Sequence, residues 1–222
     1  MVALAVALMF VIVILTDLAV VKYREWRAAH AAVPAAAIAA LWEIPEGVHL
    51  SSAHTWFRPD PAGGLEIGAD ALIVHAMGAV ERIVLPKPGD QVTAGQPLFR
   101  LERDGRRITV PSTLTGKVAS VNTHLAQQAG LLISDPYGRG WICRVVPTAV
   151  GATAPSVHFG EKAILWLENE FARLGEFLAA QTPALEPVGA TSLDGGLPVA
   201  GCLAELDQSA WTAFEAEFLK SR

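Results

Sequence analysis

A long apolar run near the N-terminus constrains this chain more than any other feature. Residues 2–21 read VALAVALMFVIVILTDLAVV, interrupted only by one threonine and one aspartate. About 20 helical residues, each rising 1.5 Å, span the ~30 Å hydrocarbon core of a bilayer. No charge precedes the run, whereas Lys22, Arg24 and Arg27 follow it directly. This order favours a retained membrane anchor over a cleaved signal peptide.

The positive flank also predicts an orientation. Cytoplasmic segments next to a span carry the excess of Lys and Arg, so we expect the N-terminus outside and the rest of the chain in the cytoplasm, at the inner membrane. Asp17 is the unusual residue of the span. Either it makes a polar contact or a proton path within a helix bundle, or it reaches water near the cytoplasmic interface.

Composition and motifs exclude several function classes. The net charge of -5 leaves no broad basic field for nucleic acid. The only cysteines, Cys143 and Cys202, are far apart, which suits a reducing compartment and provides neither a disulfide framework nor a zinc site. The six histidines form no HxH or HxxxH pair, and His54 in HTW is expected to make a structural hydrogen bond. We therefore expect no metal, cofactor, small-molecule substrate or enzymatic activity.

Alternating residues after position 44 predict a mainly β fold. In PLFRLER, Phe99 and Leu101 alternate with polar residues, and RRITVP repeats the pattern. Asp104-Gly105 lies between the two segments, and this dipeptide favours a type I′ hairpin because both positions need positive φ. We expect short strands joined by tight turns, with one or two helical turns at Ala71–Met77.

Two later segments predict amphipathic helices. Residues 161–180 place apolar side chains three and four positions apart. The residues of this stripe are Ile164, Leu167, Phe171, Leu174 and Leu178. The stripe packs either on the β domain or on a partner, which makes Phe171 and Leu174 interaction candidates. A C-terminal helix, capped by Asp207 or Ser209, presents Trp211, Phe214 and Phe218 on one side. Residues 148–160 between the strands and the first helix are predicted to be a loop.

Several segments resemble the H protein of the glycine cleavage system. They are IPEGVHLSSAHTWF, GLEIGADALIVHAMGAVERIVLPKPGDQVTAGQPL and DPYGRGW, within residues 45–146, and LAELDQSAWTAF is similar to the family's C-terminal helix. The resemblance implies a lipoyl-type flattened β barrel, a barrel-sandwich hybrid, with a lipoyl lysine on a hairpin turn in an E-S-V-K pattern. It covers about half of the chain.

The sequence departs from the family at that lysine. Glu102 matches the glutamate of the pattern and Gly116 matches a later glycine, but the lysine position is Gly105. Arg106 and Arg107 cannot replace it, because a guanidinium stays protonated and forms no lipoyl amide. We expect no lipoyl carrier function and do not carry over the family's partners.

The features above divide the chain into five parts. They are a transmembrane anchor with its basic flank (1–28), a linker (29–44), the H protein-like β domain (45–146), an inserted loop and helix (147–198) and a C-terminal helix that returns to the β domain (199–222). The anchor and the insertion are foreign to the soluble family, and both favour attachment and assembly over chemistry.

We therefore expect a non-catalytic accessory or scaffold subunit of a multi-subunit membrane complex. Its layout resembles that of the H subunit of bacterial photosynthetic reaction centres, which suggests a respiratory or photosynthetic electron-transfer complex as host. The alternatives are a membrane-tethered lipoyl carrier and an efflux-type adaptor. The RDGRR tip, with Arg103, Asp104, Arg106 and Arg107, is either a contact for an acidic partner or anionic headgroups, or a solvated turn.

Overall fold

A computed structural model describes residues 16, 20, 43–148, 156–181 and 198–220. The chain divides into two compact units, Met1–Val33 and Pro34–Arg222. In the first unit only Thr16 and Val20 are described, and both are helical. The rest of the expected anchor, with Asp17, and nearly all of the expected linker lie outside the described residues. Within the described part of the chain, no helix combines the length and apolarity that a bilayer crossing needs.

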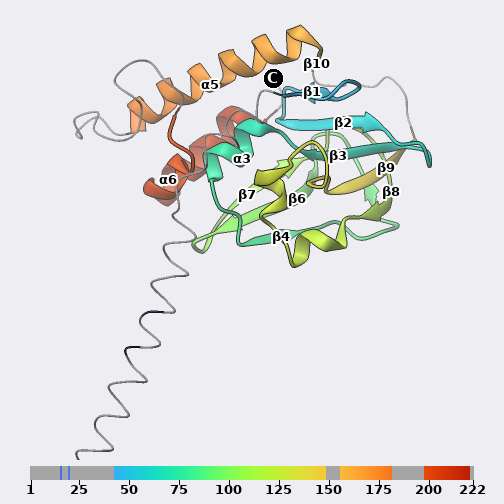
Figure 1. The fold of residues 1–222 in the computed structure, drawn as a ribbon, viewed down its shortest axis with the longest axis horizontal. Helices are drawn as coiled ribbons and strands as arrows, with labels where there is room; N and C mark the ends of the chain where they lie inside the picture. The colour runs from blue at the N-terminus through green and yellow to red at the C-terminus, as the bar shows by residue number, and fades with distance from the viewer. Residues whose placement is uncertain (1–15, 17–19, 21–42, 149–155, 182–197, 221–222) are drawn as a thin grey trace, which may run out of the picture. The chain divides into compact units, whose positions relative to one another are not determined.

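The second unit is built from ten short strands in two antiparallel sheets (Figure 1). The seven-stranded sheet has the order β10-β1-β2-β3-β9-β8-β5 and the three-stranded sheet has the order β4-β6-β7. The strands are β1 (His49–Ser51), β2 (Thr55–Pro59), β3 (Leu65–Ala69), β4 (Arg82–Val84), β5 (Gln91–Val92), β6 (Pro97–Arg103), β7 (Arg106–Pro111), β8 (Gly116–Val121), β9 (Cys143–Pro147) and β10 (Val157–Phe159). The mainly β prediction is confirmed.

Helices cover the sheets and connect them. They are α3 (Ala71–Met77), the 3-10 turn η1 (Thr123–Ala126), α4 (Leu131–Ser134), α5 (Glu161–Gln181), the 3-10 turn η2 (Cys202–Glu205), α6 (Gln208–Phe214) and the π-helical turn η3 (Glu215–Leu219). The predicted helix at Ala71–Met77 is confirmed. It begins at Asp70, whose carboxylate accepts hydrogen bonds from the backbone N–H groups of Leu72 and Ile73.

The predicted β6–β7 hairpin is also confirmed. Asp104 and Gly105 have φ values of 50° and 71°, the positive values that this two-residue turn requires. Arg103 pairs with Arg106 at the closing position, and Leu101 pairs with Ile108 inside the core. The alternation of apolar and polar residues in the sequence therefore sets the two faces of this hairpin.

A buried tryptophan joins two distant motifs of the β domain. The Trp56 indole N–H on β2 donates a hydrogen bond of 3.0 Å to the Pro136 carbonyl in the DPYGRGW turn. A Cβ atom at Gly68 on the neighbouring strand β3 would collide with the indole ring. Glycine is therefore required at position 68, beside the Trp56 ring. With the ring in this place, its hydrogen bond to Pro136 fixes the position of the DPYGRGW turn.

The segment predicted to be an insertion, residues 147–198, contains a strand that the sequence prediction missed. Residues 157–159, expected to be a loop, form β10, which pairs with β1 in the register His49 to Phe159. The backbone of β10 obtains its partners from a strand far away in the sequence, so local patterning does not reveal it. The strand extends the larger sheet and leads directly into α5.

Helix α5 confirms the predicted amphipathic helix and ends one residue later than expected. Four residues of its stripe are buried and Ile164 is half-buried. Phe171 meets the ring of His75 on α3 at 5.3 Å, and Phe177 contacts Phe214 and Phe218 at 6.0 and 5.7 Å. The buried face of α5, which includes Phe177 besides the stripe, therefore packs within the chain, against α3 and the C-terminal helix.

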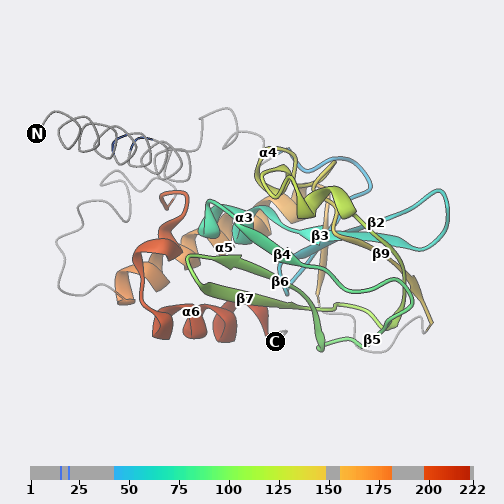
Figure 2. The same cartoon turned by 90° about the horizontal axis from the view of Figure 1, so that it is seen from below.

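The C-terminal helix follows the prediction closely. The Asp207 carboxylate, rather than Ser209, caps it by accepting a hydrogen bond of 3.0 Å from the Ala210 N–H. Trp211, Phe214 and Phe218 are all buried. Figure 2 shows α6 lying alongside β7, on the side of that strand that has no strand partner.

We expect Phe171→Glu to lower the free energy of unfolding by about 3–5 kcal/mol, because it removes a buried ring and places an unpaired charge among apolar groups. Asn169→Glu, at an exposed position of the same helix, should change it by less than about 0.5 kcal/mol. Chemical denaturation in mild detergent measures both. Equal stabilities for the two variants would contradict the packing of α5.

Candidate functional site

The tip of the β6–β7 hairpin is the position where the resemblance places a lipoyl lysine. Asp104 and Gly105 form the turn, and both are exposed. A Cβ atom built on Gly105 would meet nothing within 4 Å, so the position is open to solvent. No lysine occurs between Pro97 and Pro111.

The first arginine of the tip is buried rather than presented to solvent. Arg103 is only 5% exposed, and its guanidinium donates hydrogen bonds to the Met77 carbonyl at the end of α3 and to the Asp104 carboxylate. The side chain of Arg103 therefore fastens strand β6 to helix α3.

The second arginine holds the other strand of the hairpin. Arg106 donates hydrogen bonds of 2.9 and 2.6 Å to the carbonyls of Ala204 and Leu206, and its guanidinium lies 5.9 Å from the Trp211 ring centroid. Arg107 is exposed. Of the four residues proposed as a contact surface at the tip, Asp104 and Arg107 are thus exposed, whereas Arg103 and Arg106 bind the protein's own backbone.

A second cluster of polar groups is centred on His54. This residue lies in the β1–β2 turn with φ of 56°, and only 1% of it is exposed. Its Nδ1 lies 2.8 Å from the Asp70 carboxylate, and its Nε2 lies 3.4 Å from the Glu170 carboxylate of α5. The expected structural hydrogen bond of His54 is present. Its two partners were not predicted, because they come from distant segments.

The cluster continues from α5 to the C-terminal segment. Arg173 donates hydrogen bonds of 2.6 and 2.7 Å to the two Glu170 oxygens and one of 2.9 Å to the Glu217 carbonyl. Its guanidinium also lies 4.3 Å from the Phe218 ring centroid. Carboxylate, imidazole and guanidinium alternate along this network, so each buried charge faces one of opposite sign.

The network determines the protonation of His54. Burial opposes the charged imidazole, but the charge and hydrogen bond of Asp70, with those of Glu170, outweigh it and raise the pKa of His54 to about 9. Burial opposes the ionisation of Glu170 as well, yet His54 and Arg173 lower the pKa of its carboxyl. At neutral pH the cluster is therefore an ionic link between buried groups.

The described residues offer little for catalysis. No group of three potential ligands for a metal occurs in that part of the chain. Burial raises the pKa of the thiols of Cys143 and Cys202 to about 12, so neither is a thiolate at neutral pH. His54 is enclosed and cannot meet a substrate. The buried polar groups described above therefore position elements of the fold.

Comparisons of the chain with a family model and with individual proteins agree on one family. The chain matches the family described as Glycine cleavage H-protein over residues 48–161. It is 32% identical over 103 residues to the glycine cleavage system H protein of Mycobacterium avium (strain 104), covering 46% of this chain and 78% of that protein. It is 31% identical over 105 residues to the H protein of Shewanella sp. (strain ANA-3), covering 47% and 81%.

A solved structure is also similar. The crystal structure of a glycine cleavage system H protein from Mycobacterium marinum aligns with a TM-score of 0.49 at 25% identity, covering 57% of this chain and 99% of that one.

The hydrogen bonds of Arg106 lead to a prediction for which the exposed Arg107 provides the control. Arg106→Gln should lower the free energy of unfolding by about 2–3 kcal/mol, because two carbonyls lose a charged donor. Arg107→Gln should change it by less than about 0.5 kcal/mol. Hydrogen exchange should accelerate in residues 202–214 only in the first variant. Equal exchange in the two variants would show that Arg106 does not hold this segment.

The His54 cluster predicts a pH dependence of stability. A pKa raised from 6.5 to about 9 contributes about 3 kcal/mol, fully present below pH 6.5 and lost as the pH rises through 9. The stability gap between the protein and His54→Asn, which tolerates the positive φ, should therefore shrink from about pH 6 to about pH 10. Urea denaturation measures it, with the exposed His124→Asn as control. A gap independent of pH would mean that folding does not shift the pKa of His54, and a gap that widens as the pH rises through 6.5 would mean that His54 is neutral in the fold.

Proposed function

Because this chain belongs to the glycine cleavage H-protein family, we propose that it keeps the family's β fold, lacks the lipoyl group and acts as a non-catalytic accessory subunit of a membrane complex. Members of the family are non-catalytic carrier proteins. In this proposal residues 2–21 anchor the chain with the N-terminus outside, and the β domain docks on other subunits at the cytoplasmic face of the inner membrane. A respiratory or photosynthetic electron-transfer complex is the proposed host.

The single observation that carries the proposal is the hairpin tip. A carrier needs a primary amine there to form the lipoyl amide, and Gly105 has no side chain. The lysines Lys87 and Lys117 lie in the turn before β5 and on β8, away from the tip. Arg103 and Arg106 fasten both strands of the hairpin to the body, which supports a fixed surface in place of a mobile carrier.

The inserted segment supports docking. Strand β10 is the edge of the larger sheet, so its outer backbone groups have no strand partner among the described residues. Phe159 on this strand is 60% exposed, and Leu165 on the first turns of α5 is 59% exposed. An open strand edge beside exposed apolar side chains is suited to protein contact.

One purification tests both the proposed lack of a lipoyl group and the proposed role as a subunit of a membrane complex. The chain is purified in mild detergent through a C-terminal tag from cells that also express a lipoate ligase and a lipoylated H protein. We expect its intact mass to equal that of the unmodified sequence, and we expect membrane subunits to co-purify in fixed ratio. Gly105→Lys should gain lipoate, since nothing lies within 4 Å of the position, and its φ of 71° should cost the new side chain about 1–2 kcal/mol of stability.

One outcome would contradict the lack of a lipoyl group, and a different outcome would contradict the role as a subunit. A mass increase of one lipoyl unit in the natural chain would show that it is a carrier that uses another lysine. Purification of the chain alone, with full recovery from the membrane, would contradict the role as a subunit.

A further inference from the structure

The three-stranded sheet has an outer face that carries an unusual group of arginines. Antiparallel pairing places Arg82, Glu102 and Arg107 in one row across β4, β6 and β7, and Val84, Arg100 and Thr109 in the next. Paired residues share a face of the sheet, and the partners Ile83, Leu101 and Ile108 occupy the buried face. We call Arg82, Arg100, Arg107 and the central Glu102 the basic face.

Most of the charge on the basic face is not neutralised. The Arg82 side chain is 73% exposed, and its guanidinium is 3.6 Å from the Glu102 carboxylate. Arg100 and Arg107 are exposed and make no ion pair or side-chain hydrogen bond with any residue that the structure describes. The face therefore has a net charge of about +2 in a chain whose net charge is -5.

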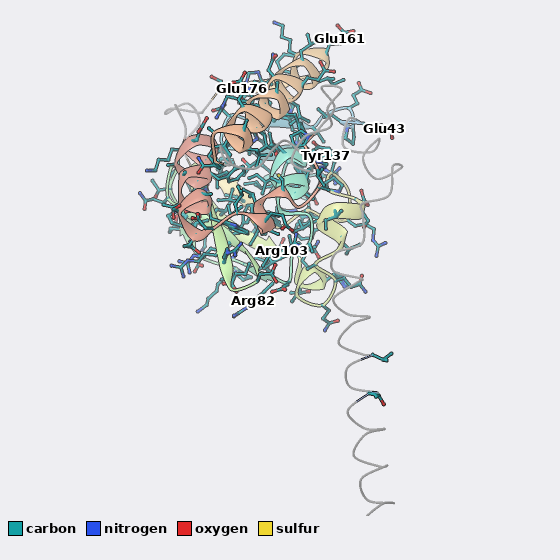
Figure 3. All side chains as sticks on the ribbon, turned by 90° about the vertical axis from the view of Figure 1, so that its left-hand side faces the viewer. Glu43, Arg82, Arg103, Tyr137, Glu161 and Glu176 are labelled. Atoms are coloured by element: carbon teal, nitrogen blue, oxygen red, sulfur yellow. The ribbon has the colours of Figure 1, made fainter. Side chains whose placement is uncertain are left out.

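The opposite end of the folded body is acidic. Glu161, Glu168 and Glu176 are exposed on α5, and the exposed Lys162 offsets one of them, which leaves a net charge of about -2. Figure 3 shows Glu161 and Glu176 at one end of this body and Arg82 at the other, and Figure 1 likewise places α5 and β4 on opposite sides. An anionic surface would therefore attract one side of the domain and repel the other, which gives it a single orientation.

The composition of the basic face favours headgroups over a protein partner. Protein interfaces centre on buried aromatic and aliphatic anchors. Among the described residues of the folded body, the exposed large apolar side chains are Val146, Val157, Phe159, Leu165 and Val199, and none of them lies on β4, β6 or β7. Phosphate groups need only charge and hydrogen-bond donors, and a guanidinium supplies both to phosphate in a bidentate manner.

We propose that the basic face lies against the anionic lipid headgroups of the membrane that holds residues 2–21, an inference that rests on the proposed anchor. The 15 residues 28–42 reach at most about 50 Å when extended, which permits the contact. Arg82, Arg100 and Arg107 bind lipid phosphates, and α5 with β10 faces away from the bilayer. The domain thus presents its apolar edge to partner subunits.

Fluorescence quenching of the full chain in vesicles tests this orientation. A maleimide dye is attached to Gly105→Cys beside the basic face or to Ala172→Cys on the exposed side of α5. Cys143 and Cys202 are buried and remain unlabelled. The vesicles contain phosphatidylcholine with a headgroup nitroxide as quencher, with or without phosphatidylglycerol.

We expect phosphatidylglycerol to increase quenching at position 105 and to leave position 172 unchanged, with the increase lost in high salt. Each arginine should strengthen the attraction by about fivefold, so Arg82→Gln, Arg100→Gln and Arg107→Gln together should remove the increase. Equal quenching in both lipids, or an increase that survives the triple variant, would overturn the proposal. The proposal would also be overturned if phosphatidylglycerol left the quenching at position 105 unchanged while the complex purified with the triple variant lost an acidic subunit. The basic face would then bind a protein.

Flotation with vesicles tests the proposed anchor separately from the basic face. A chain that does not float with phosphatidylcholine vesicles contradicts the proposed anchor. Flotation with phosphatidylglycerol vesicles then tests the basic face directly. Binding that the triple variant abolishes supports the inference, and absence of binding overturns it.

Discussion

The contact of one imidazole with two carboxylates organises the whole folded body. His54 comes from the turn between the first two strands, Asp70 caps α3, and Glu170 comes from the inserted helix α5. Asp70 is fully buried and its ionic partner among the described residues is His54, so loss of the imidazole would leave a buried charge unpaired, at a cost of several kcal/mol. Glu170 is also held by Arg173, and its contact with His54 adds α5 to the cluster. The Asp70 oxygen that does not face His54 accepts the backbone N–H of Leu72, so the same side chain also starts the helix.

A continuous set of contacts runs from this cluster to the β6–β7 hairpin. Helix α3 begins at the cluster and ends at Met77, whose carbonyl accepts the hydrogen bond of Arg103. The C-terminal segment, held to α5 through Arg173, provides the carbonyls that accept from Arg106. Helix α5 therefore supports the helices that hold the tip. A hairpin secured on both strands suits a permanent docking surface better than a moving arm.

Features set by neighbouring residues could be predicted from the sequence. The alternation around Asp104-Gly105 predicted the hairpin, and the 3.6-residue stripe predicted α5, since both patterns act over a few positions. Arg103 and Arg106 were misinterpreted because their charge suggested solvent exposure. Their positions in the alternation, in line with Leu101 and Ile108, place them on the inner face.

Long-range features could not be predicted in the same way. Strand β10 has three residues and depends on β1 for its hydrogen bonds, and nothing near His54 in the sequence indicates Glu170. The arginines of the basic face come from three strands and gather only when the strands pair. Most of the apolar N-terminal run lies outside the described residues, so its interpretation rests on sequence alone.

The pairing of β1 with β10 has a consequence for biosynthesis. His49 pairs with Phe159, more than a hundred positions later in the chain. A ribosome adding about 5–20 residues per second needs roughly 5–20 s to make the intervening segment. Throughout that interval β1 is an open sheet edge on a nascent chain, the kind of surface that pairs with other chains. Pairing with β10 then closes the outer edge of β1, and the open edge on that side of the finished sheet is the three-residue strand β10.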